Sequence, residues 1–173
     1  MNPSIKTKLL SVFDDIQFST REQNRLEISV EKQVVPAVLS FLKNQGYNHL
    51  GLISCVDWIE ERTFELLYIL SAYMKDDEVH MEDDKINILV KTRISREKPV
   101  CISAIPIFEI AEPYEREIHE LFGIHFEGHP RLTPLFLERE YSIPPFRKDF
   151  DTKEYVKTVF DSVPFVTEKA LEK

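Results

Sequence analysis

Apolar residues recur at helical spacing in four parts of the chain, three of which are described first. Residues 34–44 carry apolar side chains three and four positions apart, Pro36 falls in the first turn, where proline is tolerated, and Gly46 follows as a stop. Residues 3–16 show a similar pattern and predict a first helix, and residues 152–160 predict a short helix near the other end. Each predicted helix has one apolar face, which must be covered by another element.

A second group of segments alternates between apolar and polar positions and is rich in β-branched residues, as strands are. These predicted strands are residues 25–30, 49–57, 64–73, 85–94 and 100–105. Polar, turn-like links join the three central strands: residues 60–62 and 75–84. We therefore expect the three central strands to pair antiparallel.

The stretch from Glu112 to Phe150 organises the rest of the chain and begins as a helix. Pro113 suits the first helical position, and Gly123 can adopt the left-handed conformation that ends a helix. At 100° per residue the apolar stripe is Tyr114, Ile118, Leu121 and Phe122, the opposite face is Arg116, His119 and Glu120, and Glu115 and Glu117 flank the stripe. Either flanking glutamate is therefore placed to be partly buried.

Beyond Gly123 a short alternating run leads to a turn at Gly128, His129 and Pro130. The following segment, residues 128–150, is here called the strap. Four prolines exclude a regular helix or a central strand in it: Pro130, Pro134, Pro144 and Pro145. Yet the strap is rich in large apolar residues, unlike a disordered linker. We expect it to lie in a groove, either of its own domain or of another subunit.

This order of elements predicts an α+β fold, with an antiparallel sheet packed against helices and followed by an extended C-terminal tail. We expect an α+β core domain over residues 1–127 and an extended partner-binding tail over residues 128–173, with a polar end from Thr167 onward. The chain has 173 residues, of which 43% are apolar, so it can bury a core.

Charge and composition exclude several classes of protein. The net charge of −8 argues against general nucleic-acid binding. Cys55 and Cys101 are isolated and fit buried thiols better than a disulfide framework. No apolar run is as long as a membrane span, and the N-terminus lacks a signal-peptide core.

The sequence shows no self-contained active site. His119-Glu120-Leu121-Phe122-Gly123 begins like the zinc motif H-E-x-x-H but has glycine where the second ligand belongs. We interpret His119, His125 and His129 as surface and turn residues. Asp57 is most simply a solvated strand end, and Glu115 or Glu117 most simply pairs with Arg116. We expect that pair to hold the helix against the turn at residues 128–130.

Two classes of function remain. The first is a structural subunit whose tail docks on an enzyme partner, and the second is a small enzyme whose carboxylates and histidines converge only in three dimensions. The proline-rich apolar tail favours the first class. Protease digestion of the isolated protein distinguishes the two classes. A docking tail should be cut rapidly from about Gly128 onward, whereas the same segment of a self-sufficient enzyme should not.

The key stretch resembles a known family. The run E-R-E-x-x-x-L-F-G-I-x-F-x-G-H-P, from Glu115 to Pro130, and the element Pro145 to Phe150 resemble the C subunit of the respiratory NADH:quinone oxidoreductase (complex I). The same type of protein occurs in related membrane-bound [NiFe] hydrogenases and ferredoxin-linked complexes. The first hundred residues match only in length and in expected element order.

The resemblance implies a non-catalytic scaffold subunit in the peripheral arm, on the cytoplasmic face of the cell membrane, with no catalytic, cofactor or metal residue of its own. Its implied partners are a large hydrogenase-like subunit and a small iron–sulfur subunit, which would hold the iron–sulfur clusters and any NiFe centre. The predicted partner-binding residues are Arg116, His129, Pro130, Leu135, Phe136, Pro145, Phe146, Arg147, Lys148, Asp149 and Phe150. We expect Arg147, Lys148 and Asp149 to make charged contacts across the interface.

The chain departs from the quinone-linked pattern after Pro130. Quinone-linked relatives usually continue with an acidic or amide residue and two arginines, whereas here the run is Arg131 to Leu137, RLTPLFL. This run of residues is more similar to that of the hydrogenase-type members. The alternatives are the C subunit of an NADH:quinone oxidoreductase and a small independent enzyme.

Overall fold

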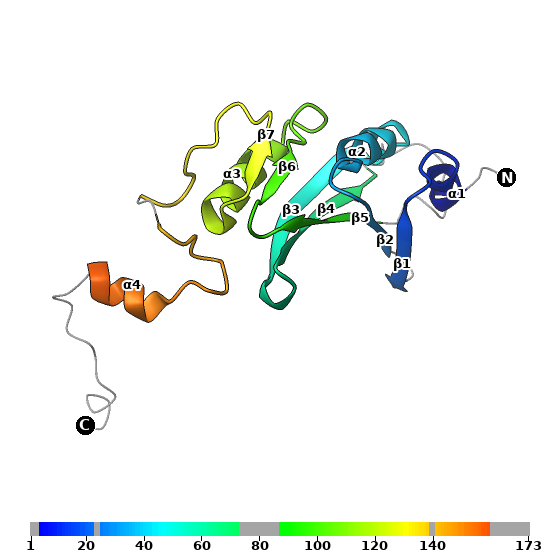
Figure 1. Ribbon diagram of the computed structural model, residues 1–173. Coiled ribbons are helices and arrows are strands. Elements are labelled where there is room, and N and C mark those ends of the chain that lie inside the picture. The colour runs from blue at the N-terminus through cyan, green and yellow to red at the C-terminus, as the bar shows by residue number, and fades with distance from the viewer. Residues whose placement is uncertain (1–3, 23–24, 73–86, 139–140, 160–173) are drawn as a thin grey trace, which may run out of the picture.

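The computed structural model describes residues 4–22, 25–72, 87–138 and 141–159 (Figure 1). Its elements in chain order are α1 (Ile5–Leu10), β1 (Gln17–Glu22), β2 (Arg25–Ser29), α2 (Val35–Asn44), β3 (His49–Trp58), the 3₁₀ turn η1 (Ile59–Glu61), β4 (Thr63–Ser71), β5 (Asn87–Ser95), β6 (Val100–Ile102), α3 (Ala111–Phe122), β7 (His125–Glu127) and α4 (Thr152–Val159). The two ends of the described chain, α1 and α4, lie at opposite ends of the molecule.

A five-stranded sheet in the order β1-β2-β5-β4-β3 forms the centre of the fold. The predicted antiparallel pairing of the three central strands is confirmed, since β3 pairs with β4 and β4 with β5 in that sense. The sheet is nevertheless mixed, because β2 pairs parallel with β5. The α+β fold class is confirmed.

The core lies on one face of this sheet. Along β4 every second side chain is without solvent exposure: Phe64, Leu66, Tyr68 and Leu70. Helix α2 covers this face with Val38, Leu39 and Leu42, which are equally buried. Burying a side chain of this size stabilises the fold by about 1.5–3 kcal/mol, so this apolar layer is the main source of cohesion.

Strands β6 and β7 form a separate two-stranded parallel ladder, and α3 connects them along the chain. The predicted strand at 100–105 therefore exists only as Val100–Ile102, and it pairs with β7 instead of the main sheet. The ladder is extended by the amide of Ser103, which donates to the carbonyl of Glu127 at 2.9 Å. Helix α3 packs against the edge strand β3, where the hydroxyl of Tyr114 donates to the carbonyl of Gly51 at 2.9 Å.

The N-terminal prediction was partly wrong. The helix predicted over residues 3–16 is short and ends at Leu10, where the amides of Val12 and Phe13 both turn back to the carbonyl of Leu9. Residues Gln17–Glu22 form a strand that the sequence pattern did not reveal. Pairing with β2 provides hydrogen-bond partners for their backbone groups and places Phe18 beside Ile28. These contacts favour a strand more than the apolar periodicity favours a helix.

Other predictions hold as far as the described residues reach. The C-terminal helix is present over Thr152–Val159, and the expected buried thiol is found at Cys101, whereas Cys55 is half-buried. The predicted loop at 75–84, Phe160 and the polar end from Thr167 lie outside the described residues. In the described part of the chain, no helix combines the length and apolar character that crossing a bilayer requires.

Candidate partner interface

Helix α3 begins at Ala111, two residues before the predicted start, so Pro113 is its third residue. Proline is still tolerated there because amides of the first turn have no partner within the helix. The predicted C-terminal stop is confirmed, since Gly123 has φ +75° and ends the helix. The apolar stripe is turned inward, with Ile118 and Leu121 buried.

Glu115, which flanks the stripe, is fully buried. Its carboxylate accepts hydrogen bonds from the hydroxyl of Ser103 at 2.7 Å and from the amide of Ala104 at 2.6 Å. Burial raises the pKa of Glu115 to about 7, against the opposing effect of these two hydrogen bonds. The interpretation of Glu115 as an ion-pair partner of Arg116 was wrong, because its role is to tie α3 to the end of β6.

Glu120 fastens the strap to the exposed side of α3. Its carboxylate accepts hydrogen bonds from three successive amides, those of Leu135 and Phe136 at 3.0 Å and that of Leu137 at 2.5 Å. Partial burial alone would raise the pKa of Glu120, but these hydrogen bonds outweigh it and hold the pKa below its ordinary value. The three amides form a concave cradle of the kind that binds anions.

Arg116 holds the first part of the strap. Its guanidinium donates to the carbonyls of Thr133 and Pro134 at 3.0 and 2.9 Å and contacts Glu112 at 3.4 Å. We expected Glu115 or Glu117 as its partner and the turn at 128–130 as what it holds, so this expectation was wrong in both respects.

His129 ties that turn to the helix instead. Nδ1 of His129 accepts from the amide of Arg131 at 3.0 Å, so Nε2 carries the proton and donates to the carbonyl of Glu112 at 3.3 Å. Pro130 is exposed beside it. The turn and the segment after it are therefore held by separate contacts on α3.

The second part of the strap caps the C-terminus of α3. The amide of Phe146 donates to the carbonyl of Leu121 at 3.0 Å, and Nε of Arg147 donates to the carbonyl of Phe122 at 2.7 Å. The last carbonyls of a helix have no partner within it, so residues distant in sequence supply one here. A Cβ on Gly123 would lie 3.0 Å from both Pro144 Cγ and Arg147 Nη2, which shows how closely the strap passes.

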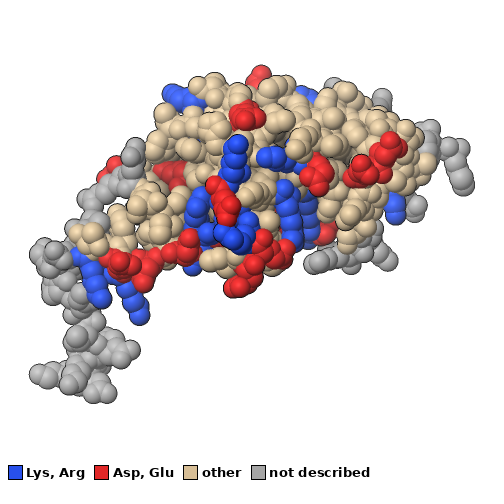
Figure 2. All heavy atoms as spheres, in the orientation of Figure 1, with Lys and Arg blue, Asp and Glu red and all other residues tan. Residues whose placement is uncertain are grey.

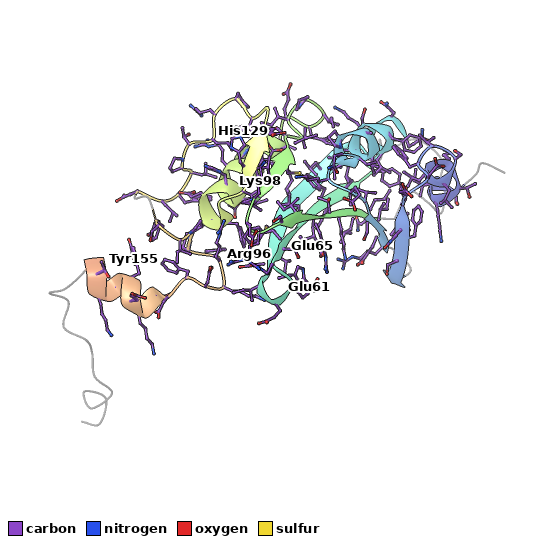
Figure 3. The ribbon with its side chains drawn as sticks, in the orientation of Figure 1. Glu61, Glu65, Arg96, Lys98, His129 and Tyr155 are labelled. Carbon is purple, nitrogen blue, oxygen red and sulfur yellow. The ribbon has the colours of Figure 1, made fainter. Side chains whose placement is uncertain are left out.

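Asp57 joins the strap to the sheet. Its carboxylate, 3% exposed as a residue, accepts from Arg96 Nε at 2.9 Å, from Arg96 Nη2 at 3.2 Å and from the amide of Lys148 at 2.9 Å. Arg96 also binds Asp149 at 2.5 Å. The interpretation of Asp57 as a solvated strand end was wrong. Arg96 lies below α3 in Figure 3, beside the end of the β3–β4 hairpin marked by Glu61 and Glu65.

The strap ends in an aromatic cluster at α4. Tyr141 stacks on Tyr155 with ring centroids 4.9 Å apart, and Phe150 contacts both rings at 5.9 and 5.6 Å (Figure 3). The carboxylate of Asp151 accepts from the amides of Lys153 and Glu154 and thereby caps the helix.

Most predicted interface residues thus contact their own domain. Arg147 donates to the carbonyl of Phe122, and Asp149 pairs with Arg96, all within the same chain. The ammonium of Lys148 lies 5.9 Å from the ring centre of Trp58. Leu135, Pro145 and Phe150 are half-buried. Phe136 and Phe146 are 67% and 60% exposed. Binding of a partner by any of these residues stays a prediction.

The sequence alone did not reveal Glu120, Asp57 or Arg96 as anchor points. A signal for Glu120 exists in hindsight, because the amides of Leu135 to Leu137 follow a proline and have no strand or helix to join, so they need an external acceptor. Nothing comparable identifies Asp57, whose burial depends on how the strap returns across the sheet.

The described residues contain no group of three or more histidine, cysteine, aspartate or glutamate side chains arranged to hold a metal ion. His119 Nδ1 faces the carbonyl of Ile124 at 2.8 Å and His125 is exposed. Basic and acidic side chains are interleaved over the middle of the face in Figure 2 rather than gathered by sign. The most distinctive surface feature is therefore the strap.

Comparison with known proteins finds relatives of this chain. A family model described as "Respiratory-chain NADH dehydrogenase, 30 Kd subunit" matches residues 28–156. The C subunit of the F(420)H(2) dehydrogenase of Methanosarcina mazei is 31% identical over 129 residues, which are 73% of this chain and 76% of that protein. The fused C/D subunit of the NADH-quinone oxidoreductase of Blochmanniella pennsylvanica is 27% identical over 95% of this chain, which spans only 27% of that protein.

A solved structure matches nearly the whole chain. It is the structure of the membrane-bound sulfane sulfur reductase, an archaeal respiratory membrane complex. The matched chain of that complex is 28% identical, with a TM-score of 0.80, and the match covers 95% of this chain and 94% of the other.

Proposed function

Because the chain belongs to the family of the respiratory-chain NADH dehydrogenase 30 kDa subunit, we propose that it is a non-catalytic scaffold subunit of a membrane-bound, complex I-like oxidoreductase. It docks on the large subunit through the strap and supports electron transfer that is coupled to ion translocation. The observation that carries this proposal is the strap itself, which is fastened to α3 at Glu120 and at Leu121 yet leaves large aromatic side chains exposed.

The relatives support the choice of partner. Some relatives are named as C/D subunits and carry both designations on one polypeptide, which favours a large subunit of the D type close to this chain. A small iron–sulfur subunit is the second proposed partner. The iron–sulfur clusters, and a NiFe centre where one is present, would belong to these partners, and this chain would bind no cofactor. We place the assembly at the cytoplasmic face of the cell membrane.

Within the family we favour a ferredoxin-linked, hydrogenase-type complex or a close relative. The support is the run Arg131 to Leu137, which departs from the quinone-linked pattern, and the similarity to the sulfane sulfur reductase along most of both chains. The alternative is the C subunit of an NADH:quinone oxidoreductase, which the family description favours.

Co-purification tests both levels of this proposal. The tagged chain is isolated from detergent-solubilised membranes of its own source, and the proteins that accompany it are identified and quantified. We expect a large subunit and an iron–sulfur subunit in equal amount, and metal analysis of the large subunit distinguishes a hydrogenase from a quinone- or sulfur-linked enzyme. Recovery of the chain alone, turning over a substrate unaided, would refute the scaffold proposal.

A further inference from the structure

We propose that Phe136 and Phe146 are the anchors of the strap and insert into uncharged, apolar recesses of the large subunit, whereas Arg147 and Asp149 only hold the strap to its own domain. This inference rests on the proposed function and adds the chemistry of the partner surface. It reverses the division of roles expected from the sequence, in which the charged residues of the strap cross the interface.

Both phenylalanines are fixed to the last turn of α3 through their backbone amides. The amide of Phe136 donates to the carboxylate of Glu120 at 3.0 Å, and the amide of Phe146 donates to the carbonyl of Leu121 at 3.0 Å. Adjacent helix residues therefore hold two strap residues that are ten positions apart. The backbone at both phenylalanines is therefore positioned before any partner arrives, which lowers the entropic cost of binding.

These two side chains are the most exposed large apolar groups among the described residues. Phe136 is 67% exposed, and Phe146 is 60% exposed although its ring meets the edge of Phe122 with centroids 5.9 Å apart. Aromatic side chains lose little conformational entropy on binding and dominate the energy of many interfaces. Ile143 of the same strap is 39% exposed and widens the apolar surface.

The charged groups that hold the strap are already engaged within the chain. Arg96 bridges Asp149 and the buried Asp57, and Glu120 binds three amides. Arg147 donates to the carbonyl of Phe122 and lies over the ring of Phe64, 5.2 Å from its centre. A partner that offered a countercharge to these groups would have to break existing contacts. These contacts leave the exposed aromatic rings, rather than Arg147 or Asp149, to meet the partner.

The occupant is the D-type large subunit, because relatives named C/D join that subunit to the sequence matched here. The strap is also hydrogen-bonded to α3, so docking at Phe136 and Phe146 would align the whole domain on the partner. Removing the ring of an interface anchor typically weakens binding by about 30-fold or more.

Binding measurements with single variants test this inference. The probe is the large subunit recovered by co-purification, and its affinity for the full-length chain is measured for wild type, Phe136→Ala, Phe146→Ala and Lys148→Ala. Lys148→Ala removes a charge of the strap while its amide can still bind Asp57. Val12→Ala is the matched control, since Val12 is 57% exposed and lies in the segment that follows α1, at the other end of the molecule from α4. Circular dichroism and thermal unfolding of each variant verify that the fold is retained.

We expect about 30-fold weaker binding for each phenylalanine variant and a change of less than about threefold for Lys148→Ala and Val12→Ala. The wild-type affinity should also fall by less than about threefold between 0.1 and 0.5 M salt, because apolar contacts are not screened. Unchanged binding of both phenylalanine variants, or strong loss for Lys148→Ala or at high salt, would overturn the inference while leaving the docking function intact. Absence of binding by the folded wild-type chain would instead overturn the proposed function.

Discussion

At Gly123 the backbone conformation and the space around the residue both require glycine. Its φ of +75° is costly for other residues, and the strap lies 3.0 Å from where a Cβ would stand. We predict that Gly123→Ala lowers the free energy of unfolding by about 2–4 kcal/mol, from backbone strain together with the contact with Pro144.

Gly46→Ala is the matched control for this prediction. Gly46 also has a positive φ, of +100°, but a Cβ there meets no atom within 4 Å. Urea denaturation should show that Gly46→Ala costs only the backbone strain, about 1–2 kcal/mol. Equal losses for the two variants would mean that the strap does not rest on Gly123 in solution.

Glu115 gives the protein a characteristic pH dependence. Its pKa rises from 4.5 to about 7 on folding, so the folded state binds the proton more tightly and stability falls as the pH rises through this window. We predict that Glu115→Gln reduces the loss of stability between pH 5 and pH 8 by about 2 kcal/mol. Denaturation curves of the variant and the wild type at both pH values check this, and parallel pH profiles would contradict it.

Individual side chains show where sequence reasoning reaches its limit. Gly123 was predicted correctly because a helix end and its left-handed residue are local features. The burial expected for a glutamate beside the apolar stripe is confirmed at Glu115, but its partners and the burial of Asp57 were missed because they depend on segments distant in sequence: the start of the loop after β6 and the amide of Lys148 in the strap. A polar residue can therefore be predicted to be exposed only where no segment distant in sequence packs over it.

At the scale of elements, the strap and α3 stabilise one another. We predict that Glu120→Ala releases the amides of Leu135 to Leu137, because a partly exposed carboxylate hydrogen bond contributes about 1–2 kcal/mol. Hydrogen exchange at these amides should accelerate about tenfold or more while the sheet amides stay protected. Glu117→Ala is the control, since Glu117 lies on the same helix and makes no described hydrogen bond to the strap.

The same contact has a predictable pH dependence. A carboxylate whose pKa is lowered by folding contributes its full stabilisation above its ordinary value of 4.5, and the contribution is lost as the pH falls below that value. Acid should therefore free the strap in the wild type and have no such effect on Glu120→Ala. Protection of the strap amides that is independent of both pH and Glu120 would show that other contacts hold it.

The elements themselves were mostly visible in the sequence. Helix α2 and the strands β3, β4 and β5 follow clear periodicities and were predicted close to their observed bounds. Two features were missed, β1 and the parallel pairing of β2 with β5, and both depend on which strands meet rather than on any one segment. The strap was identified from its prolines. The sequence left open whether it lies on its own domain or on a partner, and its contacts with its own domain became visible only in the structure.

At the scale of the whole molecule, Arg96 connects three distant parts of the chain: the end of β3 at Asp57, the segment after β5, and the strap at Asp149. We predict that Arg96→Ala lowers the free energy of unfolding by about 3 kcal/mol, because it leaves the buried carboxylate of Asp57 without a countercharge. Thermal or urea unfolding of the full chain measures this loss.

Arg93→Ala provides the comparison. Arg93 pairs with Glu61 of η1 and Glu65 of β4, but its side chain is 47% exposed, whereas that of Arg96 is 15% exposed. Exposed pairs contribute about 0–1 kcal/mol, so Arg93→Ala should have little effect. Similar losses for the two variants would contradict the role assigned to Asp57 as a buried junction.

The parallel ladder between β2 and β5 has a consequence for biosynthesis. While the polypeptide emerges from the ribosome, β1 with β2 and β3 with β4 can each form a hairpin from neighbours in sequence. The strand that unites these hairpins, Asn87–Ser95, is the last of the five sheet strands to be made, so nascent chains that end before it expose two incomplete sheet edges. Such chains are the stage at which aggregation competes with folding, and a chaperone that shields strand edges would act there.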